Sequence, residues 1–180
     1  MYHISNDVRA RKSAMHICNA LLECSKHKSF SEITVSELSK NYGISRTTFY
    51  RLFDNVADIL EYACDQMGQS ILLDIHGNTP KEMIIHIICE LSKHKDFIHL
   101  LCESGHLDIF QKIQEKYLPL SKLSNEIDLA SNSTYFHRIL AHIIPVTIDL
   151  WASEGQTSSP EEVYEKLQQS IKILEIWFSD

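Results

Sequence analysis

The sequence has 180 residues, of which 44% are hydrophobic and 23% are charged, and its formal net charge is −7. These proportions are typical of a folded globular protein and exclude a disordered chain. No apolar run reaches the 18 residues of a membrane span, and the polar first residues, MYHISNDVRARK, lack the apolar core of a signal peptide. We therefore expect a cytoplasmic protein.

The charge is unevenly distributed along the chain. Residues 1–53 contain eight Lys or Arg and four acidic residues, a net charge of +4, whereas residues 54–180 contain nine and twenty, a net charge of −11. A basic N-terminal part in an otherwise acidic protein places affinity for a polyanion, such as a nucleic acid, at that end.

The first predicted helix extends from Asp7 to Lys26, where apolar residues recur at helical spacing. Three basic residues near its start could contact phosphates or could simply face solvent: Arg9, Arg11 and Lys12.

Two short helices follow, and each has its own start signal. Thr34 and Glu37 have the spacing of a capping box, and Ser45 can cap the second helix. Gly43 between them can adopt the positive φ that ends the first. Two short helices joined by such a turn form a helix-turn-helix, whose second helix is built to enter the major groove of DNA.

The second helix has a polar side that a purely structural helix would not need. Its apolar residues are only Phe49, Leu52 and Phe53. The other side chains can hydrogen-bond to phosphates or base edges. They are Arg46, Thr47, Thr48, Tyr50 and Arg51.

This region resembles a known family. Thr34-Val35, the turn YGIS at 42–45 and the sequence TFYRLF at 48–53, followed by Asp54-Asn55, are similar to the DNA-binding domain of TetR/AcrR-type transcriptional regulators. The resemblance implies that Thr34 and Tyr50 contact phosphates and that Arg46 and Thr47 reach bases. The full predicted interface is Thr34, Ser45, Arg46, Thr47, Thr48, Tyr50 and Arg51. Family members commonly carry Lys and Glu after the residue that caps the fourth helix, where this sequence has Val56 and Ala57.

Asn55 and Asp58 provide a start signal for a fourth helix, which we expect to run through Ile75 and stop at Gly77-Asn78. At about twenty residues it would be roughly 30 Å long, enough to connect the N-terminal part to the rest. A fifth helix begins at Pro80, and a sixth covers Phe97–Cys102 and ends near Gly105. A seventh is capped by Asp108 and extends to Leu118. Residues 121–133 form a polar loop.

The last two predicted helices, Tyr135–Trp151 and Glu161–Phe178, are apolar on more than one face. Either they form a four-helix dimer interface with their symmetry mates, or the protein is thick enough to bury both faces within one chain. The resemblance favours the dimer, because TetR-like regulators generally dimerise through their last two helices. The predicted interface is Ile139, Ile143, Val146, Leu150, Leu167, Ile171, Leu174 and Phe178.

Residues 151–163 (WASEGQTSSPEEV) are also similar to the C-terminal region of a subgroup that includes regulators of dihydroxyacetone-kinase operons, and this similarity supports the helix boundaries there. We expect an all-α protein of about nine helices in two domains. They are a helix-turn-helix DNA-binding domain of residues 1–54, which we call the head, and a ligand-binding and dimerisation domain of residues 55–180, which we call the body.

The family resemblance also implies a small-molecule cavity inside the body. Apolar residues that could line it, or could be plain core, are Met67, Ile71, Ile88, Phe97, Leu101, Phe110, Tyr117, Phe136 and Leu140. His137 or His142 could orient a ligand.

Other chemistry is poorly supported. The sequence has no phosphate-binding Gly-rich loop, no G-x-S-x-G and no H-E-x-x-H, so we expect no enzyme activity and no cofactor. Five widely spaced cysteines indicate buried thiols and no disulfide framework. His99, Cys102 and His106 have spacing that could bind zinc, but Gly105 should end the helix before His106 aligns, so we predict no metal site.

The sequence thus predicts a homodimer that binds a near-palindromic DNA operator as a repressor and is released by a small-molecule effector. Two alternatives remain. The body could be a docking surface for another protein, with activation or repression as the output, or the protein could bind a ligand and have weakened DNA affinity.

Overall fold

The computed structural model of the chain describes residues 2–5, 7–76, 79–117 and 134–177, except for the side chains of residues 80, 134–138, 140, 141, 174, 175 and 177. Within these ranges the chain is helical throughout, apart from loops and an isolated bridge between Tyr2 and Phe53, so the all-α prediction is confirmed. The helices are α1 (Val8–Ser25), the 3-10 helix η1 (Phe30–Glu32), α2 (Val35–Tyr42), α3 (Arg46–Leu52), α4 (Ala57–Leu73), α5 (Pro80–Ser92), α6 (Lys95–Glu103), α7 (Leu107–Tyr117), α9 (Thr134–Ser153) and α10 (Pro160–Trp177).

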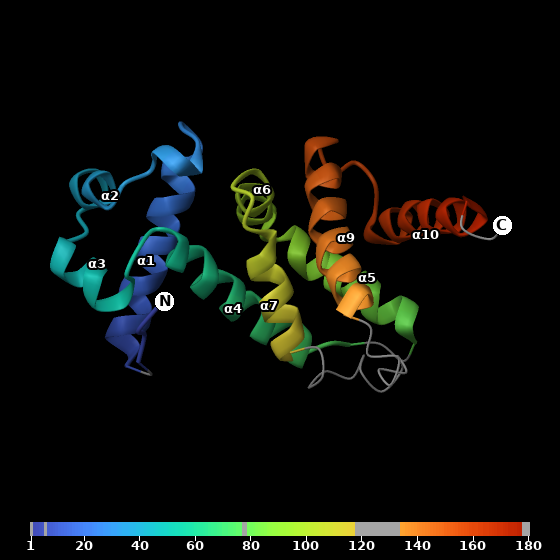
Figure 1. Cartoon of the computed structure of the whole chain (residues 1–180), viewed down its shortest axis with the longest axis horizontal. Coiled ribbons are helices and arrows are strands. Elements are labelled where there is room, and N and C mark those ends of the chain that lie inside the picture. The colour runs from blue at the N-terminus through green and yellow to red at the C-terminus, as the bar shows by residue number, and fades with distance from the viewer. Residues whose placement is uncertain (1, 6, 77–78, 118–133, 178–180) are drawn as a thin grey trace.

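Helices α1, α2 and α3 lie together at one end of the molecule, and α4 runs from them into the remaining helices (Figure 1). α1 packs against α2, α3, α4 and α6, while α4 packs against α5 and α7. α9 covers α5, α6 and α7. α10 contacts α5 and α9 near its start and then projects from the far end of the molecule (Figure 1).

The predicted start signals act as helix caps in most places. Asn55 accepts the Asp58 amide N–H at 3.1 Å at the start of α4. Asp7, which was expected to be the first residue of the first helix, instead caps α1 by accepting the Arg9 amide N–H at 2.9 Å. Pro80 occupies the first turn of α5, as predicted, and Thr79 before it accepts the Glu82 amide N–H at 3.3 Å. The Thr79 cap was missed, although T-x-x-E is the capping-box spacing.

Several predicted boundaries are wrong. The sixth helix, expected over Phe97–Cys102, is α6 and extends from Lys95 to Glu103. α4 ends at Leu73 and has 17 residues, so it stops short of Ile75. Ile75 is still buried after the chain has left the helix, and the apolar pattern therefore continued past the helix end. α7 begins at Leu107, which places Asp108 in its first turn instead of at its cap. The predicted loop at 121–133 lies outside the described residues.

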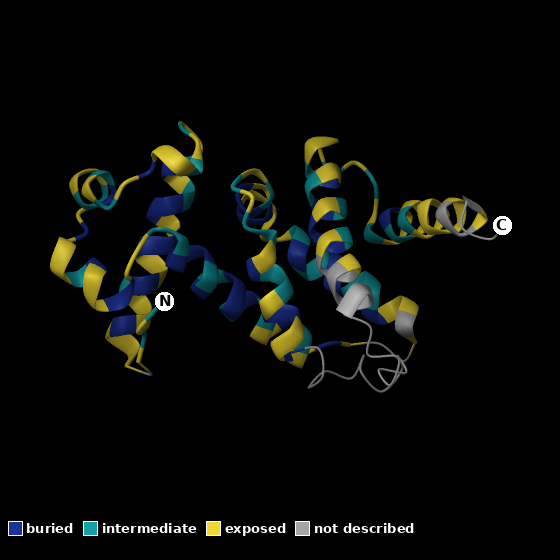
Figure 2. Ribbon diagram, viewed as in Figure 1, coloured by how far each residue is buried: buried dark blue, intermediate teal, exposed yellow. Residues whose placement is uncertain are grey.

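The buried side chains form one continuous core that extends from α1 through α4 into α5, α6, α7 and α9. Figure 2 shows buried segments on the facing sides of these helices and mostly exposed residues along the outer part of α10. The five cysteines are free, and burial raises the pKa of Cys18 to about 12 and that of Cys102 to about 11. Thiols with such high pKa values stay protonated and unreactive near neutral pH.

α7 approaches α4 closely at Gly68. A Cβ atom at this position would overlap Ile113 Cγ2 and would lie 3.3 Å from Tyr117 Cδ2. A glycine in the middle of a helix is unfavourable by roughly 1 kcal/mol relative to alanine. At position 68 the missing side chain allows α7 to pack closely against α4. None of the described helices is long and apolar enough to cross a membrane.

An exposed ion pair joins α6 to α9. His99 Nδ1 lies 2.7 Å from Asp149 Oδ1, and Nε2 lies 3.4 Å from Glu103 Oε1 one turn along α6. The hydrogen bond to Asp149 raises the pKa of His99, and the nearby charges of Glu103 and Asp96 add to this effect.

This pair predicts a pH-dependent contribution to stability. Because the pKa of His99 is raised on folding, its stabilising effect is complete below the unfolded value of about 6.5 and is lost as the pH rises through the folded value. Asp149→Asn should therefore lower the melting temperature more at about pH 6 than at about pH 9. Thermal denaturation at both pH values measures this difference. An equal loss at both pH values, or a loss from Asp149→Asn that stays pH-dependent in the His99→Gln background, would contradict the assignment.

Candidate nucleic-acid interface

The helix-turn-helix is defined by the N-terminal caps of its two helices and by one glycine in the turn between them. The Thr34 hydroxyl accepts the Glu37 amide N–H at 3.3 Å, and the Ser45 hydroxyl accepts the Thr48 amide N–H at 3.0 Å. Gly43 ends α2 with a φ of 67°, in the left-handed region that glycine adopts without strain. Each cap contributes about 1 kcal/mol, so local bonds set how α3 leaves α2.

Three side chains attach α3 to the core. Phe49, Leu52 and Phe53 are almost completely buried. The ring of Phe49 lies 5.8 Å from that of Phe53, which lies 6.0 Å from the ring of Tyr62 in α4. Because these residues occupy one side of a short helix, the opposite side must face solvent.

The outer side of α3 carries the predicted DNA-contacting residues. Arg46, Thr47 and Arg51 are exposed, and Tyr50 is 55% exposed. Thr34 and Ser45, at the caps, are exposed as well, whereas Thr48 is half-buried and its hydroxyl accepts a hydrogen bond from Ser45 at 2.8 Å. The seven predicted residues therefore lie together on α3 and at the N-terminus of α2.

Arg46, the first residue of α3, has a partner that the sequence did not predict. The Arg46 guanidinium donates a hydrogen bond to the Ser36 hydroxyl of α2 at 2.6 Å. This bond crosses the turn and fixes the direction of the arginine before any ligand is present. Nothing local in the sequence signals it, because the two residues are ten positions apart.

A hollow of about 390 Å³ lies beside the N-terminus of α3. Residues of α1 form one wall, including Lys12, Ser13 and His16, and the turn residues Gly43 and Ser45 form the other. His16 Nε2 donates to the Tyr42 carbonyl oxygen at 3.0 Å, which ties α1 to the end of α2. Lys12 near the start of α1 thus lies on the same side of the molecule as the N-terminus of α3, and Arg9 and Arg11 close to it in the sequence are exposed. Ser13 and His16 were not predicted.

The predicted cavity residues are mostly core. Six of the nine are buried in the continuous core and Phe110 is half-buried, while the side chains of Phe136 and Leu140 lie outside the described residues. The six are Met67, Ile71, Ile88, Phe97, Leu101 and Tyr117. Met67 and Phe97 line a cavity of about 250 Å³, which is bounded mainly by α1 and α4. Of the two histidines, His142 is exposed and the side chain of His137 is not described.

Two buried polar side chains in the body were not predicted, Asp65 of α4 and Gln114 of α7. Gln114 of α7 is 6% exposed, and neither atom of its amide has a hydrogen-bond partner among the described residues. It shares a side of α7 with Phe110 and Tyr117, since these positions are four and three residues away.

The predicted dimer residues on α9 and α10 are largely uncovered. Ile139 and Leu150 are 57% and 59% exposed, and Val146 and Ile171 are also exposed. Ile143 and Leu167 are half-buried, the side chain of Leu174 is not described and Phe178 lies outside the described residues.

The histidine and cysteine spacing in α6 does not assemble a metal site in the described part of the chain. His99 binds Asp149, and the His106 ring lies 5.3 Å from the ring of Phe30. No three His, Cys, Asp or Glu side chains among the described residues could together hold a metal ion.

α2 and α3 form a capped helix-turn-helix at one end of an otherwise helical chain, and the second of these helices is polar on its outer side. This is the arrangement of helix-turn-helix proteins. Comparison with solved structures places the fold within that class. The TetR transcriptional regulator from Streptococcus agalactiae 2603V superposes with a TM-score of 0.63 at 20% identity, over 89% of this chain and 94% of the other. The dihydroxyacetone kinase operon activator DhaS superposes with a TM-score of 0.53 at 13% identity, over 90% and 95%. The chain has the TetR-type fold, and the resemblance seen in the sequence is confirmed.

One curated protein also matches the sequence. The uncharacterized HTH-type transcriptional regulator YxbF of Bacillus subtilis (strain 168) is 20% identical over 170 residues, which is 84% of this chain. The chain spans 43% of the length of that relative. No family model matches the sequence.

Proposed function

We propose that the protein is a dimeric transcriptional regulator that binds a near-palindromic DNA operator through α3 and represses transcription until a small-molecule effector releases it. One observation carries the DNA-binding part of this proposal. α3 is locked to the core by three buried side chains while Arg46, Thr47, Tyr50 and Arg51 are exposed together on its outer side. A helix presented in this way fits the major groove, and the exposed groups can bond both base edges and phosphates.

The contacts divide into two kinds. Arg46 lies at the N-terminus of α3, from which recognition helices reach bases, and its bond to Ser36 holds it in one direction. Tyr50 and Thr34, together with Lys12 and the other basic residues of α1, supply phosphate contacts. Base contacts specify the sequence and phosphate contacts position the protein.

The proposed dimer uses α9 and α10. Ile139, Val146 and Leu150 expose apolar surface on α9, and Ile171, Ile173 and Ile176 do so on the projecting part of α10. Large apolar side chains left exposed on two neighbouring helices favour an interaction site there. A two-fold pairing of the same two helices would cover both faces at once and would place two copies of α3 about 34 Å apart, one turn of DNA.

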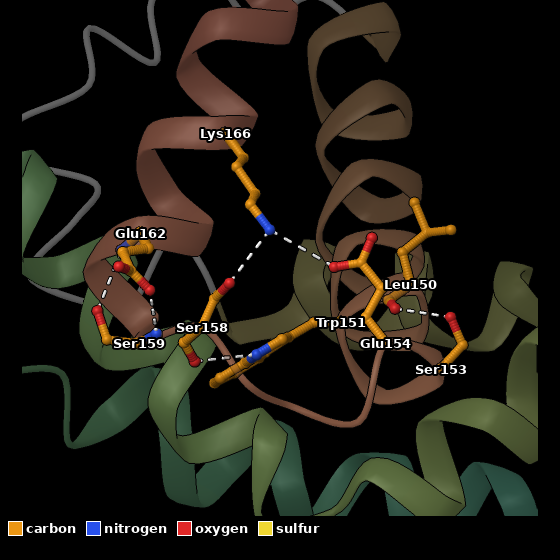
Figure 3. Close-up of polar contacts among 8 residues, drawn as sticks. All are labelled: Leu150, Trp151, Ser153, Glu154, Ser158, Ser159, Glu162 and Lys166. Atoms are coloured by element: carbon orange, nitrogen blue, oxygen red, sulfur yellow. Dashed lines mark hydrogen bonds and ion pairs between the residues drawn. The ribbon is translucent and has the colours of Figure 1, made fainter.

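The connection between α9 and α10 holds these two helices in a fixed relation (Figure 3). The Trp151 indole N–H donates to the Ser158 carbonyl oxygen at 3.1 Å, and Lys166 Nζ lies 3.1 Å from the Ser158 hydroxyl and 3.5 Å from Glu154 Oε2. Ser159 and Glu162 cap α10 reciprocally. A turn bonded in this way presents α9 and α10 to a second copy as one unit.

The proposed effector site lies at the face of α7 that Gln114 shares with Phe110 and Tyr117. A buried amide without a partner costs roughly 1–3 kcal/mol. A molecule with one hydrogen-bond donor and one acceptor would satisfy both amide atoms and gain that energy on binding.

A second candidate keeps the DNA-binding head and makes the output activation. DhaS, which superposes over most of both chains, is described as an operon activator. In this case α9 and α10 or another part of the body would contact a protein partner. A reporter gene behind the operator separates the two candidates, because deletion of the regulator raises expression under repression and lowers it under activation.

Two substitutions in α3 should weaken DNA binding in different ways. Arg46→Ala should cost about 1–3 kcal/mol on the operator and little on a scrambled duplex, because a base contact is lost. Tyr50→Phe should weaken binding to both duplexes alike, because a phosphate contact is lost. Titrations followed by fluorescence anisotropy, with an operator selected from a random duplex pool, measure both.

Ser36→Ala is the matched control for Arg46, since it removes the bond that directs the arginine and keeps the arginine itself. It should weaken operator binding less than Arg46→Ala does. Identical behaviour of Arg46→Ala and Tyr50→Phe on the two duplexes would show that the roles are assigned wrongly.

The dimer proposal predicts that Leu150→Glu dissociates the protein, since a charge would be buried without a partner at the interface. Light scattering should report about twice the chain mass of 20.8 kDa for the wild type and the single-chain mass for the variant. Leu73→Glu, at an exposed apolar residue of α4, is the control and should remain dimeric. A monomeric wild type, or a dimeric Leu150→Glu, would rule out this interface.

Gln114→Leu should stabilise the protein in the absence of effector by about 1 kcal/mol, because an apolar side chain of similar size replaces an amide that lacks partners among the described residues. Urea denaturation measures the free energy of unfolding. Gln111→Leu is the control, since the Gln111 amide donates to Glu115 at 2.7 Å, and it should bring no gain. A clear loss of stability in Gln114→Leu would mean that the amide is bonded in solution and would remove the support for the effector site.

A further inference from the structure

The N-terminal segment of residues 2–5, which we call the strap, runs along the end of the recognition helix. The His3 amide N–H donates to the carbonyl oxygen of Leu52, the last residue of α3, at 2.8 Å, and Tyr2 forms a bridge with Phe53. His3 Nε2 also lies 3.0 Å from Asp54 Oδ1. The strap therefore bonds directly to the point where α3 leaves the helix-turn-helix.

The strap is held at its other side by a buried carboxylate of α4. Asp65 is 6% exposed, and its Oδ2 atom accepts a hydrogen bond from the Tyr2 hydroxyl at 2.9 Å. The Tyr2 ring packs edge-on against Tyr62, one turn earlier in α4, at 5.3 Å. Burial and the bond to Asp65 raise the pKa of the Tyr2 hydroxyl, so it remains a hydrogen-bond donor across the physiological range.

The other oxygen of the same carboxylate accepts hydrogen bonds from residues of α7. Asp65 Oδ1 accepts hydrogen bonds from Lys116 Nζ at 2.6 Å and from the Tyr117 hydroxyl at 3.0 Å. These donors reach Asp65 because Gly68, three residues further along α4, lets Ile113 and Tyr117 approach the helix backbone. One carboxylate of α4 thus joins the strap to α7, and its three donors lie 51 to 63 residues from it in the chain.

We propose that Asp65 is a positioning residue for DNA binding, through which α7 in the body controls the strap and hence the C-terminal end of α3. The inference rests on the proposed DNA-binding function and adds to it a route between the body and the reading helix. A buried carboxylate is stable only while it is paired and hydrogen-bonded. A shift of α7 away from α4 removes both Oδ1 donors, the carboxylate loses its fixed orientation, and the Tyr2 bond at Oδ2 weakens.

The coupling is reciprocal. Anything that stabilises the strap on α3, such as bound DNA, also favours the position of α7 in which Lys116 and Tyr117 reach Asp65. Because Gln114 lies on α7 within one turn of both donors, a molecule bound at that amide would act on the same helix.

Hydrogen exchange at the His3 amide, measured by NMR on the full chain, tests the coupling without DNA. Tyr2→Phe and Asp65→Asn should speed this exchange about tenfold, the effect of losing a hydrogen bond to a charged group. Lys116→Met should speed it severalfold, although Lys116 does not touch the strap. Lys112→Met removes an equally exposed lysine of α7 that pairs with Asp108, and it should leave the rate unchanged.

A double variant isolates the route. If Lys116 acts through Asp65 and Tyr2, Lys116→Met should have no further effect in the Tyr2→Phe background. Equal acceleration by Lys116→Met in both backgrounds, or a wild-type rate in the single Lys116→Met variant, would overturn the proposal.

Salt-dependent titration of the wild type and variants with duplex DNA gives a separate result. If the exchange data show the coupling and Tyr2→Phe weakens DNA binding by severalfold, the positioning role stands. If the coupling is present but the wild type binds no duplex at any salt concentration, the proposed function fails. The positioning role for DNA then fails with it. The coupling between α7 and the strap would still be a measured property of the protein. Wild-type DNA affinity in Tyr2→Phe would overturn the positioning role alone.

Discussion

The aromatic rings of Phe49 and Phe53 pack against each other and against Tyr62 of α4, and this contact determines how the recognition helix is presented. A helix of seven residues has little stability of its own, so its position depends on these buried side chains and on its caps. Since they fill one side of α3, the polar residues on the other side face outward together. The proposed DNA interface is thus a consequence of how α3 is anchored.

α4 connects α3 to the rest of the molecule, because it contacts α3 near its start and bonds to the strap and to α7 one turn later. Near its start, α4 supplies Tyr62 to the aromatic contact, and one turn later Asp65 receives bonds from the strap and from α7. The domain boundary expected at residue 54 therefore falls just before α4, a helix that is bonded to both parts. A change in the packing of α7 can reach α3 without passing through a flexible linker.

The sequence predicted those features that depend on local signals. The caps at Thr34, Ser45 and Asn55, the turn at Gly43 and the apolar side of α3 were all found where the residue spacing placed them. Each of these features depends on residues within four positions of one another, so the local sequence is enough to predict it. The end of α4 was misplaced because Ile75 continues the burial pattern after the helix has stopped.

Contacts between distant residues were not predictable in the same way. The bonds of Arg46 to Ser36, of His16 to Tyr42 and of Asp65 to its three donors join residues between 10 and 63 positions apart. The cavity prediction had a different weakness, since hydrophobicity does not distinguish a residue that lines a cavity from one that fills the core. Gln114 was overlooked because an isolated glutamine in an amphipathic helix is ordinarily exposed.

The central claim is that the outer face of α3 contacts DNA. A titration of isotopically labelled protein with duplex DNA, followed by NMR at several salt concentrations, tests it most directly. The claim predicts that amide signals of α3, of the start of α2 and of the start of α1 shift on binding, and that the affinity falls steeply and log-linearly as salt rises. Shifts confined to the body, or an affinity that does not depend on salt, would contradict it.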